Sequence, residues 1–484
     1  MFAAAPRATR RFRATVLLPY SFGMGMRCAG LVLLGALVAC GGDGAGDPGG
    51  TGAGQATGGM GGSGGTGAGG STSTGGAGGG GAGGSLPSPA CDPLAAPSGD
   101  IVEVGPNDDV VAAVAGAASG TTVLLEDGTY DLTGAALWIQ NDDVTLRSKS
   151  GDASAVVLDG GYDTPSGGLV NVGSASGVTV AEITIQRPRF HAIHVTANQT
   201  AANGTRIYGV RLFDPGEQTI KINHHDNGVY ADGGEVACSY LELTAAGRQQ
   251  VQSYTSSGST CYTGGVDAHG ARDWVIRDNT IVGFWCDTDL SEHGIHLWTG
   301  SRDTVVERNL LVNNARGIGF GLSSGGRTYG DDPCGGIGDA SHYGGHIANN
   351  FVVGTDPALF NSPSGMDLGI GLWHACGATV VHNTVASTQA PFSSIEGRFA
   401  DTTADVVNNL VTHDIKERDG ASFSLAGNLE GAADQFVDMA GFDLHLAEGA
   451  PAIGAGDDTG VALAPEDIDG DPRATPPDVG ADQR

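Results

Sequence analysis

Two kinds of short alternating segment return along this chain at intervals of a few tens of residues. In residues 275–281 and 305–311 an asparagine lies between two apolar runs, whereas residues 294–295 and 317–318 each open a segment with Gly-Ile. Strict alternation over about four to eight residues is typical of half-buried β-strands. Because strands that return at a nearly constant interval stack into similar coils, the sequence predicts a solenoid.

The repeats can be aligned from residue 178 onward, with equivalent positions 26 to 41 residues apart. A coil of three short strands needs roughly twenty residues or slightly more, so the longer intervals indicate loop insertions. The aligned positions are Ile183, Val210, Leu241, Asn279, Asn309, Asn350, Asn383 and Asn409. The asparagines predict an internal ladder of stacked amides rather than a polar binding row.

A short helix is expected before the repeats. Residues 110–118 read VVAAVAGAA after Asn107 and Asp108, either of which is a suitable N-cap. A helix at this position would cover the open end of the solenoid, where an uncovered sheet edge favours aggregation. No long amphipathic helix follows it.

The pattern, with the opening EDGTY at residues 126–130, resembles the right-handed parallel β-helix of the pectin-lyase-like superfamily. Residues 467–473 and 477–481 resemble the tail that closes many secreted bacterial β-helix proteins. The resemblance covers roughly residues 98–484 and implies an all-β fold with a short N-terminal capping helix. This fold carries lyases, hydrolases, epimerases and non-catalytic adhesins, so it leaves the activity open.

The N-terminus has the pattern of an export signal. Arg27 precedes the apolar run 31–39, which is too short to span a bilayer as a helix, and Cys40 follows. The sequence Leu-Val-Ala-Cys at 37–40 resembles a bacterial lipobox, in which Cys40 would be lipidated; an ordinary secretory signal is the alternative. We therefore expect a signal at 1–40, a Gly-rich tether at 41–90 and a β-helix domain at 91–484. This predicts an outer-membrane lipoprotein at the cell surface or an extracellular protein, which meets the membrane only through the lipid.

The net charge of −30 argues against nucleic acid as a partner and counts mildly against a polyanionic substrate. We expect a monomer that binds a polysaccharide, either a neutral glycan or a uronan engaged through Ca²⁺ and the local Lys, Arg and His side chains. Six cysteines remain after the signal, and their even number suggests disulfides in an exported protein. We expect Cys238–Cys261 and Cys286–Cys334, because each bond would join one loop insertion or neighbouring ones.

The second strand of each coil carries the candidate chemistry. If Ile193, Ile220, Val266, Ile295, Ile318, Ile370 and Ile395 point inward, the residue after each points outward. That outward column reads His194, Lys221, Asp267, His296, Gly319, Gly371 and Glu396, and the column two residues further reads Thr196, Asn223, His269, Trp298, Gly321, Trp373 and Arg398. An exposed β face is ordinarily rich in Thr, Ser, Asn and Lys. Histidine and tryptophan in these columns therefore indicate a site, although a surface salt bridge between Lys221 and Asp267 is the plainer interpretation.

Such a face suits an extended polysaccharide, since tryptophan offers a flat apolar surface to a sugar ring. We predict Lys221, His296 and Asp267 as catalytic residues, with the pKa of Lys221 lowered by cationic neighbours so that it can act as a base. The predicted substrate-binding residues are His194, Asn223, His269, Trp298, Arg316 and Trp373. Residues 224–226, His-His-Asp, either form the rim of the site or belong to an ordinary loop.

Asp287, Asp289 and Glu292, with His293, form an acidic loop that would suit Ca²⁺; a solvated loop without any cofactor is the alternative. No Cys-x-x-Cys spacing occurs, which argues against a zinc site. The Arg-rich stretch of classical pectate lyases and the motif set of polygalacturonase-like hydrolases are missing.

Three functions remain: a polysaccharide lyase acting by β-elimination on a uronic-acid glycan, a non-catalytic glycan-binding or adhesive protein, and a glycoside hydrolase or epimerase.

Overall fold

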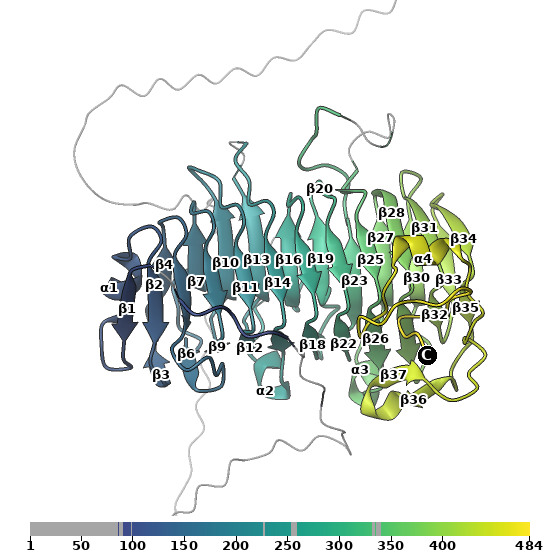
Figure 1. Cartoon of the computed structure of the whole chain (residues 1–484), viewed down its shortest axis with the longest axis horizontal. Helices are drawn as coiled ribbons and strands as arrows, with labels where there is room; N and C mark the ends of the chain where they lie inside the picture. Colours follow the sequence, from purple (N-terminus) through teal and green to yellow (C-terminus); the bar gives the residue numbers. More distant parts are fainter. Residues whose placement is uncertain are drawn as a thin grey trace, which may run out of the picture. The chain divides into compact units, whose positions relative to one another are not determined.

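The computed structural model describes residue 86 and residues 91–97, 99–225, 228–252, 259–331, 334 and 340–484. The expected signal with Cys40 lies outside the described residues, as does the expected tether apart from Leu86. Within the described residues three parallel sheets run side by side, and the chain visits them in turn, one coil after another (Figure 1). The fold is the expected right-handed parallel β-helix.

The 14-stranded sheet, which we name sheet A, consists of β1 (Ile101–Val104), β2 (Thr122–Leu125), β5 (Thr145–Ser148), β8 (Thr179–Ala181), β11 (Arg206–Tyr208), β14 (Glu235–Ala237), β17 (Val275–Arg277), β20 (Ser301–Arg302), β21 (Val305–Glu307), β24 (His342–Tyr343), β25 (His346–Ala348), β28 (Ala375–Val381), β31 (Thr403–Val407) and β34 (Ser422–Ala426). The 11-stranded sheet B consists of β3 (Gly128–Asp131), β6 (Val156–Asp159), β9 (Thr184–Gln186), β12 (Arg211–Phe213), β15 (Tyr240–Glu242), β18 (Thr280–Val282), β22 (Leu310–Val312), β26 (Phe351–Gly354), β29 (Thr384–Ser387), β32 (Leu410–Val411) and β35 (Leu429–Glu430). The 10-stranded sheet C consists of β4 (Leu137–Ile139), β7 (Gly168–Gly173), β10 (His191–Ala197), β13 (Gln218–His224), β16 (Gly264–His269), β19 (Ile295–Trp298), β23 (Arg316–Phe320), β27 (Leu368–Trp373), β30 (Ser393–Arg398) and β33 (Ile415–Arg418).

The core fills the space between the three sheets. The inward residues predicted for sheet C are paired in the expected register, and all of them are fully buried: Ile193, Ile220, Val266, Ile295, Ile318, Ile370 and Ile395. They belong to one continuous apolar cluster that extends through the coils. Each coil contributes only a few inward side chains, so its stability depends on the coils above and below it.

The predicted asparagine ladder is present at the turn between sheets A and B. Asn279, Asn309, Asn350, Asn383 and Asn409 each donate an amide N–H to the side-chain oxygen of the next asparagine, at 2.9–3.0 Å, and Asn428 ends the series. The residue before each of the first five turns the chain through a positive φ of 51–55°, namely Asp278, Arg308, Asn349, His382 and Asn408. The amides therefore satisfy buried polar groups at a corner that the backbone cannot pair by itself.

One expected ladder position was wrong. Leu241 pairs with Ile281 and faces the core, whereas the backbone N–H of Ser239 donates to Asn279 Oδ1 at 3.0 Å. The coil that contains Leu241 is thus shifted by two residues from the predicted alignment. The sequence alignment placed the apolar Leu241 at the ladder position instead of Ser239. Serine occurs too often along the chain to identify the turn by itself.

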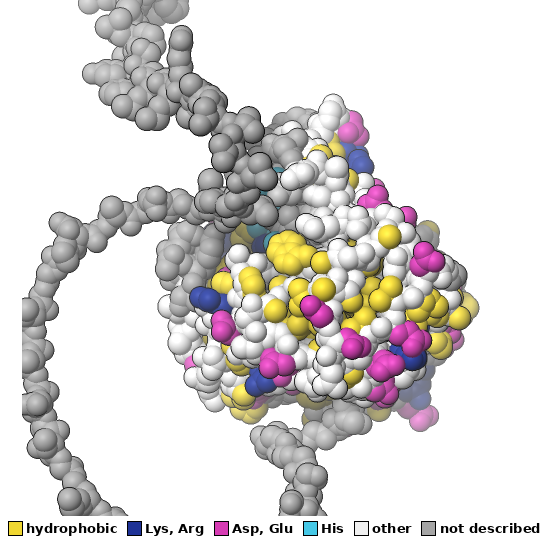
Figure 2. Space-filling model, turned by 90° about the vertical axis from the view of Figure 1, so that its left-hand side faces the viewer, with side chains coloured by type: hydrophobic (Ala, Val, Ile, Leu, Met, Phe, Trp, Pro, Cys, Tyr) yellow, Lys and Arg dark blue, Asp and Glu magenta, His cyan; other side chains and the backbone are white. Residues whose placement is uncertain are grey.

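The helices are short. Helix α1 (Val110–Ala115) is capped by Asp109, which accepts from Ala112 N, so the predicted caps Asn107 and Asp108 were wrong by one or two residues. Val110 and Val114 join the core, and α1 lies at the β1 end of the solenoid as expected. Figure 2 views this end and shows hydrophobic side chains in its middle with charged ones around them. The other helical segments are α2 (Ala245–Arg248), α3 (Pro357–Asn361), η1 (Met439–Gly441) and α4 (Thr459–Leu463).

None of the helices in the described part of the chain combines the length and apolar character needed to cross a membrane. The C-terminal region adds the antiparallel pair β36 (Phe436–Asp438) and β37 (Asp443–Leu446). The tail then packs on the outer face of sheet B, where Ala481 is buried with Leu310 and Phe351. The resemblance to a closing tail therefore has a packing basis along one side of the stack.

The expected disulfide pairs were wrong. The bonds are Cys91–Cys238, Cys261–Cys286 and Cys334–Cys376. Cys91 reaches Cys238 because the incoming segment packs on the outer face of sheet A, against Tyr208 and Ala237. The sequence gives no sign of that return path, and without it Cys238 had no evident partner.

We predict that Asn350→Ala lowers the free energy of unfolding by about 2–4 kcal/mol. The change removes the amide that donates to Val306 O, Ala348 O and Asn383 Oδ1, and it leaves these buried acceptors without that partner. Urea unfolding followed by circular dichroism measures the loss. Asn361→Ala, at an exposed position at the end of α3, is the matched control; equal midpoints for the two variants would contradict the role given to the ladder.

Candidate functional site

The two outward columns of sheet C are placed as the sequence predicted. Lys221 lies between His194 and Asp267 on the neighbouring strands, and Asp267 is followed by His296. In the second column Thr196 pairs with Asn223, and His269 pairs with Trp298. Residues far apart in the chain thus share one outer wall of the solenoid.

Lys221, Asp267 and His296 are buried, so the expectation that they form the exposed floor of a groove was wrong. Lys221 is 8% exposed, Asp267 2% and His296 1%. The rings of the second column lie against them: Trp298 stacks on His296 with centroids 5.2 Å apart, and His269 meets Trp298 at 4.5 Å. Large side chains in adjacent columns cover one another, an effect that alternation along a single strand does not reveal.

Four of these residues form what we name the Lys221 cluster: Lys221, Asp267, His269 and Trp298. The Lys221 ammonium donates to Asp267 Oδ2, and its Nζ lies 2.9 Å from His269 Nε2. The same ring nitrogen is 3.3 Å from Asp267 Oδ2, while Trp298 Nε1 donates to Asp267 Oδ1 at 2.8 Å. Both carboxylate oxygens are therefore engaged.

The electrostatics keep this pair ionised. Burial alone would raise the pKa of Asp267, but Lys221 and then His269 hold that pKa well below its usual range. Burial alone would lower the pKa of Lys221, yet the charge of Asp267 raises it above the ordinary value. The expected lowering of the Lys221 pKa was therefore wrong, and at neutral pH this residue is an ammonium group rather than a base.

His296 is a buried neutral imidazole. Burial lowers its pKa to about 4, and its Nε2 lies 3.2 Å from the carbonyl oxygen of Gly321, to which it can only donate. Its Nδ1 faces Glu292 Oε2 at 3.6 Å and Asp267 Oδ1 at 3.8 Å. A neutral nitrogen lone pair therefore points toward two carboxylates.

His194 belongs to a second hydrogen-bonded group. Its Nε2 lies 2.6 Å from Asn223 Oδ1 and 2.7 Å from the hydroxyl of Thr196, which also donates to Asn223 at 2.9 Å. Burial lowers the pKa of His194 to about 4. The three side chains hold one another beside the Lys221 cluster.

A pocket of about 380 Å³ opens next to both groups, and we name it the Tyr230 pocket. Its described lining is Asn223, His224, His225, Gly228, Tyr230, His269, Thr299, Gly326, Arg327 and Thr328. Of the predicted site residues, Asn223 and His269 reach it. His224 and His225 also line it, which favours the rim interpretation of residues 224–226; Asp226 lies outside the described residues.

Tyr230 and Arg327 were missed by the sequence analysis. The Arg327 guanidinium stacks over the Tyr230 ring at 3.4 Å and forms two hydrogen bonds to Asp232, at 2.6 and 2.9 Å. Arg327 belongs to the insertion between Asn309 and Asn350, which is the longest interval between the aligned positions. The length of that interval indicated an insertion, but the sequence did not predict the path of the insertion across the coils.

Two predicted substrate residues lie elsewhere on the wall. Arg316 donates to Asp367 at 2.7 Å and stacks over Trp373 at 5.1 Å, and Trp373 donates to Glu396 at 2.8 Å. Neither belongs to the described lining of the Tyr230 pocket. They form a separate aromatic and charged group further along sheet C.

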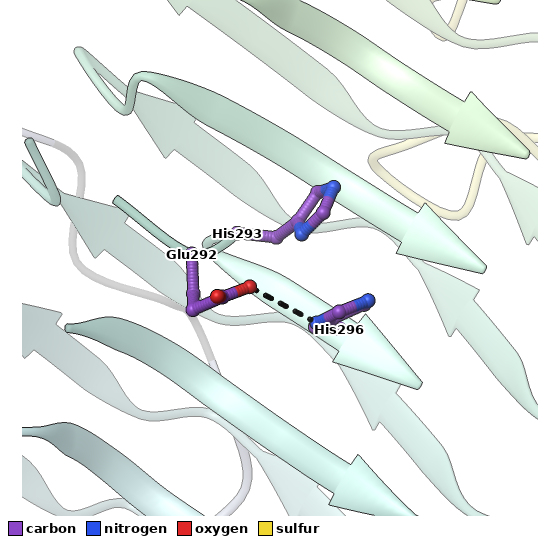
Figure 3. Close-up of side chains that lie close together, drawn as sticks. All are labelled: Glu292, His293 and His296. Carbon is purple, nitrogen blue, oxygen red and sulfur yellow. Dashed lines mark ion pairs between the residues drawn. The ribbon is translucent and has the colours of Figure 1, made fainter. Parts of the chain in front are cut away.

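Candidate metal ligands converge differently from the prediction. Asp287 is exposed, and Asp289 accepts from the backbone of Leu290 and Thr260. The donor atoms of Glu292 instead lie within 4.8 Å of those of His293 and His296 (Figure 3). Calcium at Asp287, Asp289 and Glu292 stays a prediction. His445, Asp469 and Asp482 form another such group in the tail region.

No protein-family model matches this chain, and no curated protein matches it by sequence. Solved structures with a similar fold include an alginate lyase from Paenibacillus sp. str. FPU-7, with a TM-score of 0.48 and 15% identity over 67% of this chain and 99% of that one. Pectate lyase Pel9A gives 0.42 and 13%, over 80% and 97% of the two chains. PfbA, a surface adhesin of Streptococcus pneumoniae, gives 0.43 and 12%, over 68% and 79%. Similarity at this level says nothing about activity.

Removing one member of the buried pair should cost more than removing both. We predict that Lys221→Met and Asp267→Leu each lower the free energy of unfolding by about 3–5 kcal/mol, because each leaves an unpaired buried charge. The side chains are only 10% and 3% exposed, so water cannot replace the lost partner. Urea unfolding of both single variants and of Lys221→Met/Asp267→Leu measures the coupling; strictly additive losses would contradict a coupled pair.

His194 should make the fold sensitive to acid. Its folded pKa, about 4, lies below the ordinary value of 6.5, so between these pH values the unfolded chain binds a proton that the folded chain does not. Stability is therefore lost as the pH falls through this window. We predict that His194→Gln reduces the slope of stability against pH there, measured by urea unfolding at pH 7, 6, 5 and 4. The exposed His225→Gln is the control, and equal slopes in both variants would refute the prediction.

Proposed function

We propose that this protein binds a uronic-acid-containing polysaccharide on the outer face of sheet C and cleaves it by β-elimination in the Tyr230 pocket. The observation that carries the proposal is the position of His269. This side chain lines the pocket, and its Nε2 lies 2.9 Å from Lys221 Nζ and 3.3 Å from Asp267 Oδ2. A pocket-facing imidazole backed by a buried ion pair suits proton transfer.

The reaction needs a base and an acid. The base takes the proton from C5 of the uronate, the electrons of that bond form the C4–C5 double bond, and the C4–O bond to the leaving sugar breaks. The leaving oxygen takes a proton from the acid. His269 is the proposed base, and Asp267 Oδ2, 3.3 Å from its Nε2, stabilises the imidazolium that forms. Tyr230, which also lines the pocket, is the proposed acid.

The remaining groups fit supporting roles. Lys221 keeps Asp267 ionised and holds it in place, so we propose Lys221 and Asp267 as positioning residues rather than as base and acid. His225 and Arg327 place N–H donors around the pocket, and a uronate carboxylate can accept from them. His296 is buried away from this lining, which favours a role other than direct catalysis.

The composition of the pocket separates elimination from hydrolysis. None of the described residues that line it is an aspartate or a glutamate. An inverting glycoside hydrolase needs two carboxyl groups about 6.5–9.5 Å apart at the scissile bond, and a retaining enzyme needs them closer still. Elimination has no such requirement, so the lining favours a lyase.

A non-catalytic glycan-binding protein is the second candidate. Both oxygens of Asp267 already accept hydrogen bonds, from Trp298 and Lys221, as in an ion pair that only stabilises a wall. Histidine, tyrosine and arginine side chains would then serve as a recognition surface for sugars.

We further propose that the chain is exported and attached through a lipid on Cys40. Three disulfides among the described cysteines support an oxidising compartment, where such bonds persist. This agrees with a substrate outside the cell.

The test uses the full chain and a panel of uronans and neutral glycans. We predict that a uronan yields an unsaturated product that absorbs in the ultraviolet, and that His269→Gln lowers the rate by about 100-fold or more, as expected for loss of a general base. His413→Gln, on a half-buried histidine beyond sheet B, is the matched control.

The other outcomes are distinct. New reducing ends without the ultraviolet product would identify a hydrolase, and retention of a glycan without cleavage would identify a binding protein. Full activity in His269→Gln would exclude the proposed base.

A further inference from the structure

Three side chains meet where the chain enters β19. Glu292 and His293 precede the strand and His296 lies in it, and one donor atom of each falls within 4.8 Å of the others. Figure 3 shows the carboxylate of Glu292 directed toward His296, with the ring of His293 above the line that joins them. The short local sequence Glu-His-x-x-His therefore builds one compact group beside the Lys221 cluster.

The atoms that converge lack partners. Among the buried side-chain atoms of the described residues, Glu292 Oε2, His293 Nδ1 and His296 Nδ1 make no hydrogen bond. Both histidines are only 1% exposed. An unpaired buried polar atom costs free energy, and three of them in one place call for a common partner. The carboxylate oxygen and the His296 nitrogen can only accept here, so that partner must be a cation or a donor.

The hydrogen bond of His296 fixes its orientation. Its Nε2 donates to the carbonyl oxygen of Gly321 at 3.2 Å, which leaves the Nδ1 lone pair directed at Glu292. Metal-bound histidines are held in this way, with the second ring nitrogen donating to a carbonyl or carboxylate. The carbonyl of Gly321 thus selects the tautomer that a metal ion requires.

The dimensions suit a small divalent ion. Metal–ligand bonds of about 2.0–2.2 Å at a tetrahedral zinc ion place neighbouring ligand atoms roughly 3.4 Å apart. His296 Nδ1 and Glu292 Oε2 are separated by 3.6 Å, and the three donor atoms all lie within 4.8 Å of one another. Two cations, Arg316 and Lys221, also act on Glu292 through their charges. Each of them already forms an ion pair with an aspartate: Arg316 with Asp367, and Lys221 with Asp267.

Gly319 makes room for this arrangement. A Cβ at position 319 would lie 2.6 Å from His293 Nε2 and 2.7 Å from Cδ2 of the same ring. Any side chain in this place of the outward column would therefore displace the imidazole. The absence of a side chain at Gly319 is explained by the ring that lies over it.

We propose that Glu292, His293 and His296 bind a divalent transition-metal ion of the zinc class. Two imidazoles and one carboxylate suit zinc better than calcium, which prefers a shell of oxygen atoms. Three protein ligands leave a position open to water or to another ligand. The site is independent of the proposed elimination reaction, since it lies outside the described lining of the Tyr230 pocket.

The experiment measures metal binding alone. The full chain is treated with a chelator, dialysed against Zn²⁺ or Co²⁺, and analysed for bound metal and for the visible spectrum of Co²⁺. We expect one equivalent in the native protein, a rise in melting temperature with Zn²⁺, and binding at least about 100-fold weaker in Glu292→Gln and His293→Gln, beyond the 10–100-fold typical of losing an outer-shell partner. Circular dichroism checks that each variant is folded, and Glu292→Gln is the milder change because its side chain is 25% exposed.

His445→Gln provides the matched control, because it removes the histidine of the other candidate group, with Asp469 and Asp482. Metal lost in Glu292→Gln and His293→Gln but kept in His445→Gln supports the proposal. Metal kept in both site variants and lost in His445→Gln would overturn it, as would a native protein that binds no Zn²⁺.

Discussion

The structure depends on the register between neighbouring coils. Parallel pairing in sheet C places Ile220, Val266 and Ile295 in one buried row, so the residues that follow them must share one outer row. A slip of one residue would exchange the two rows and place Lys221 and Asp267 in the core. The asparagine ladder, at a different corner of each coil, opposes such a slip because its amides bond only in one alignment.

The register, the core and the columns could be predicted because they follow from a period of two and from apolar residues that match coil by coil. Leu241 shows the limit: where serine replaces asparagine, an apolar residue two positions away gives an equally good match. The pocket could not be predicted, since Arg327 arrives on a long insertion whose path is not periodic. The burial of Lys221 depends on the rings of the adjacent column, and the pairing of Cys91 with Cys238 depends on the incoming segment that packs on sheet A.

The outer wall of sheet C combines two kinds of polar group. Lys221 and Asp267 are paired and ionised, so their charges balance within the wall. Glu292, His293 and His296 instead present unpaired atoms to one another. The first group positions a histidine at a pocket, and the second has the donor atoms of a metal site. The first group arises because neighbouring coils bring side chains from distant parts of the sequence within a few ångströms, whereas the second comes from one short segment at the start of β19.

The central claim is that the wall around His269 is where the polysaccharide binds. A crystal structure of the full chain as His269→Gln, soaked with an acidic oligosaccharide, tests it most directly. The account predicts a uronate ring in the Tyr230 pocket, within hydrogen-bonding distance of residue 269, with Lys221 and Asp267 paired behind it. A sugar bound on sheet A or B with the Tyr230 pocket empty, or Lys221 and Asp267 apart, would contradict it.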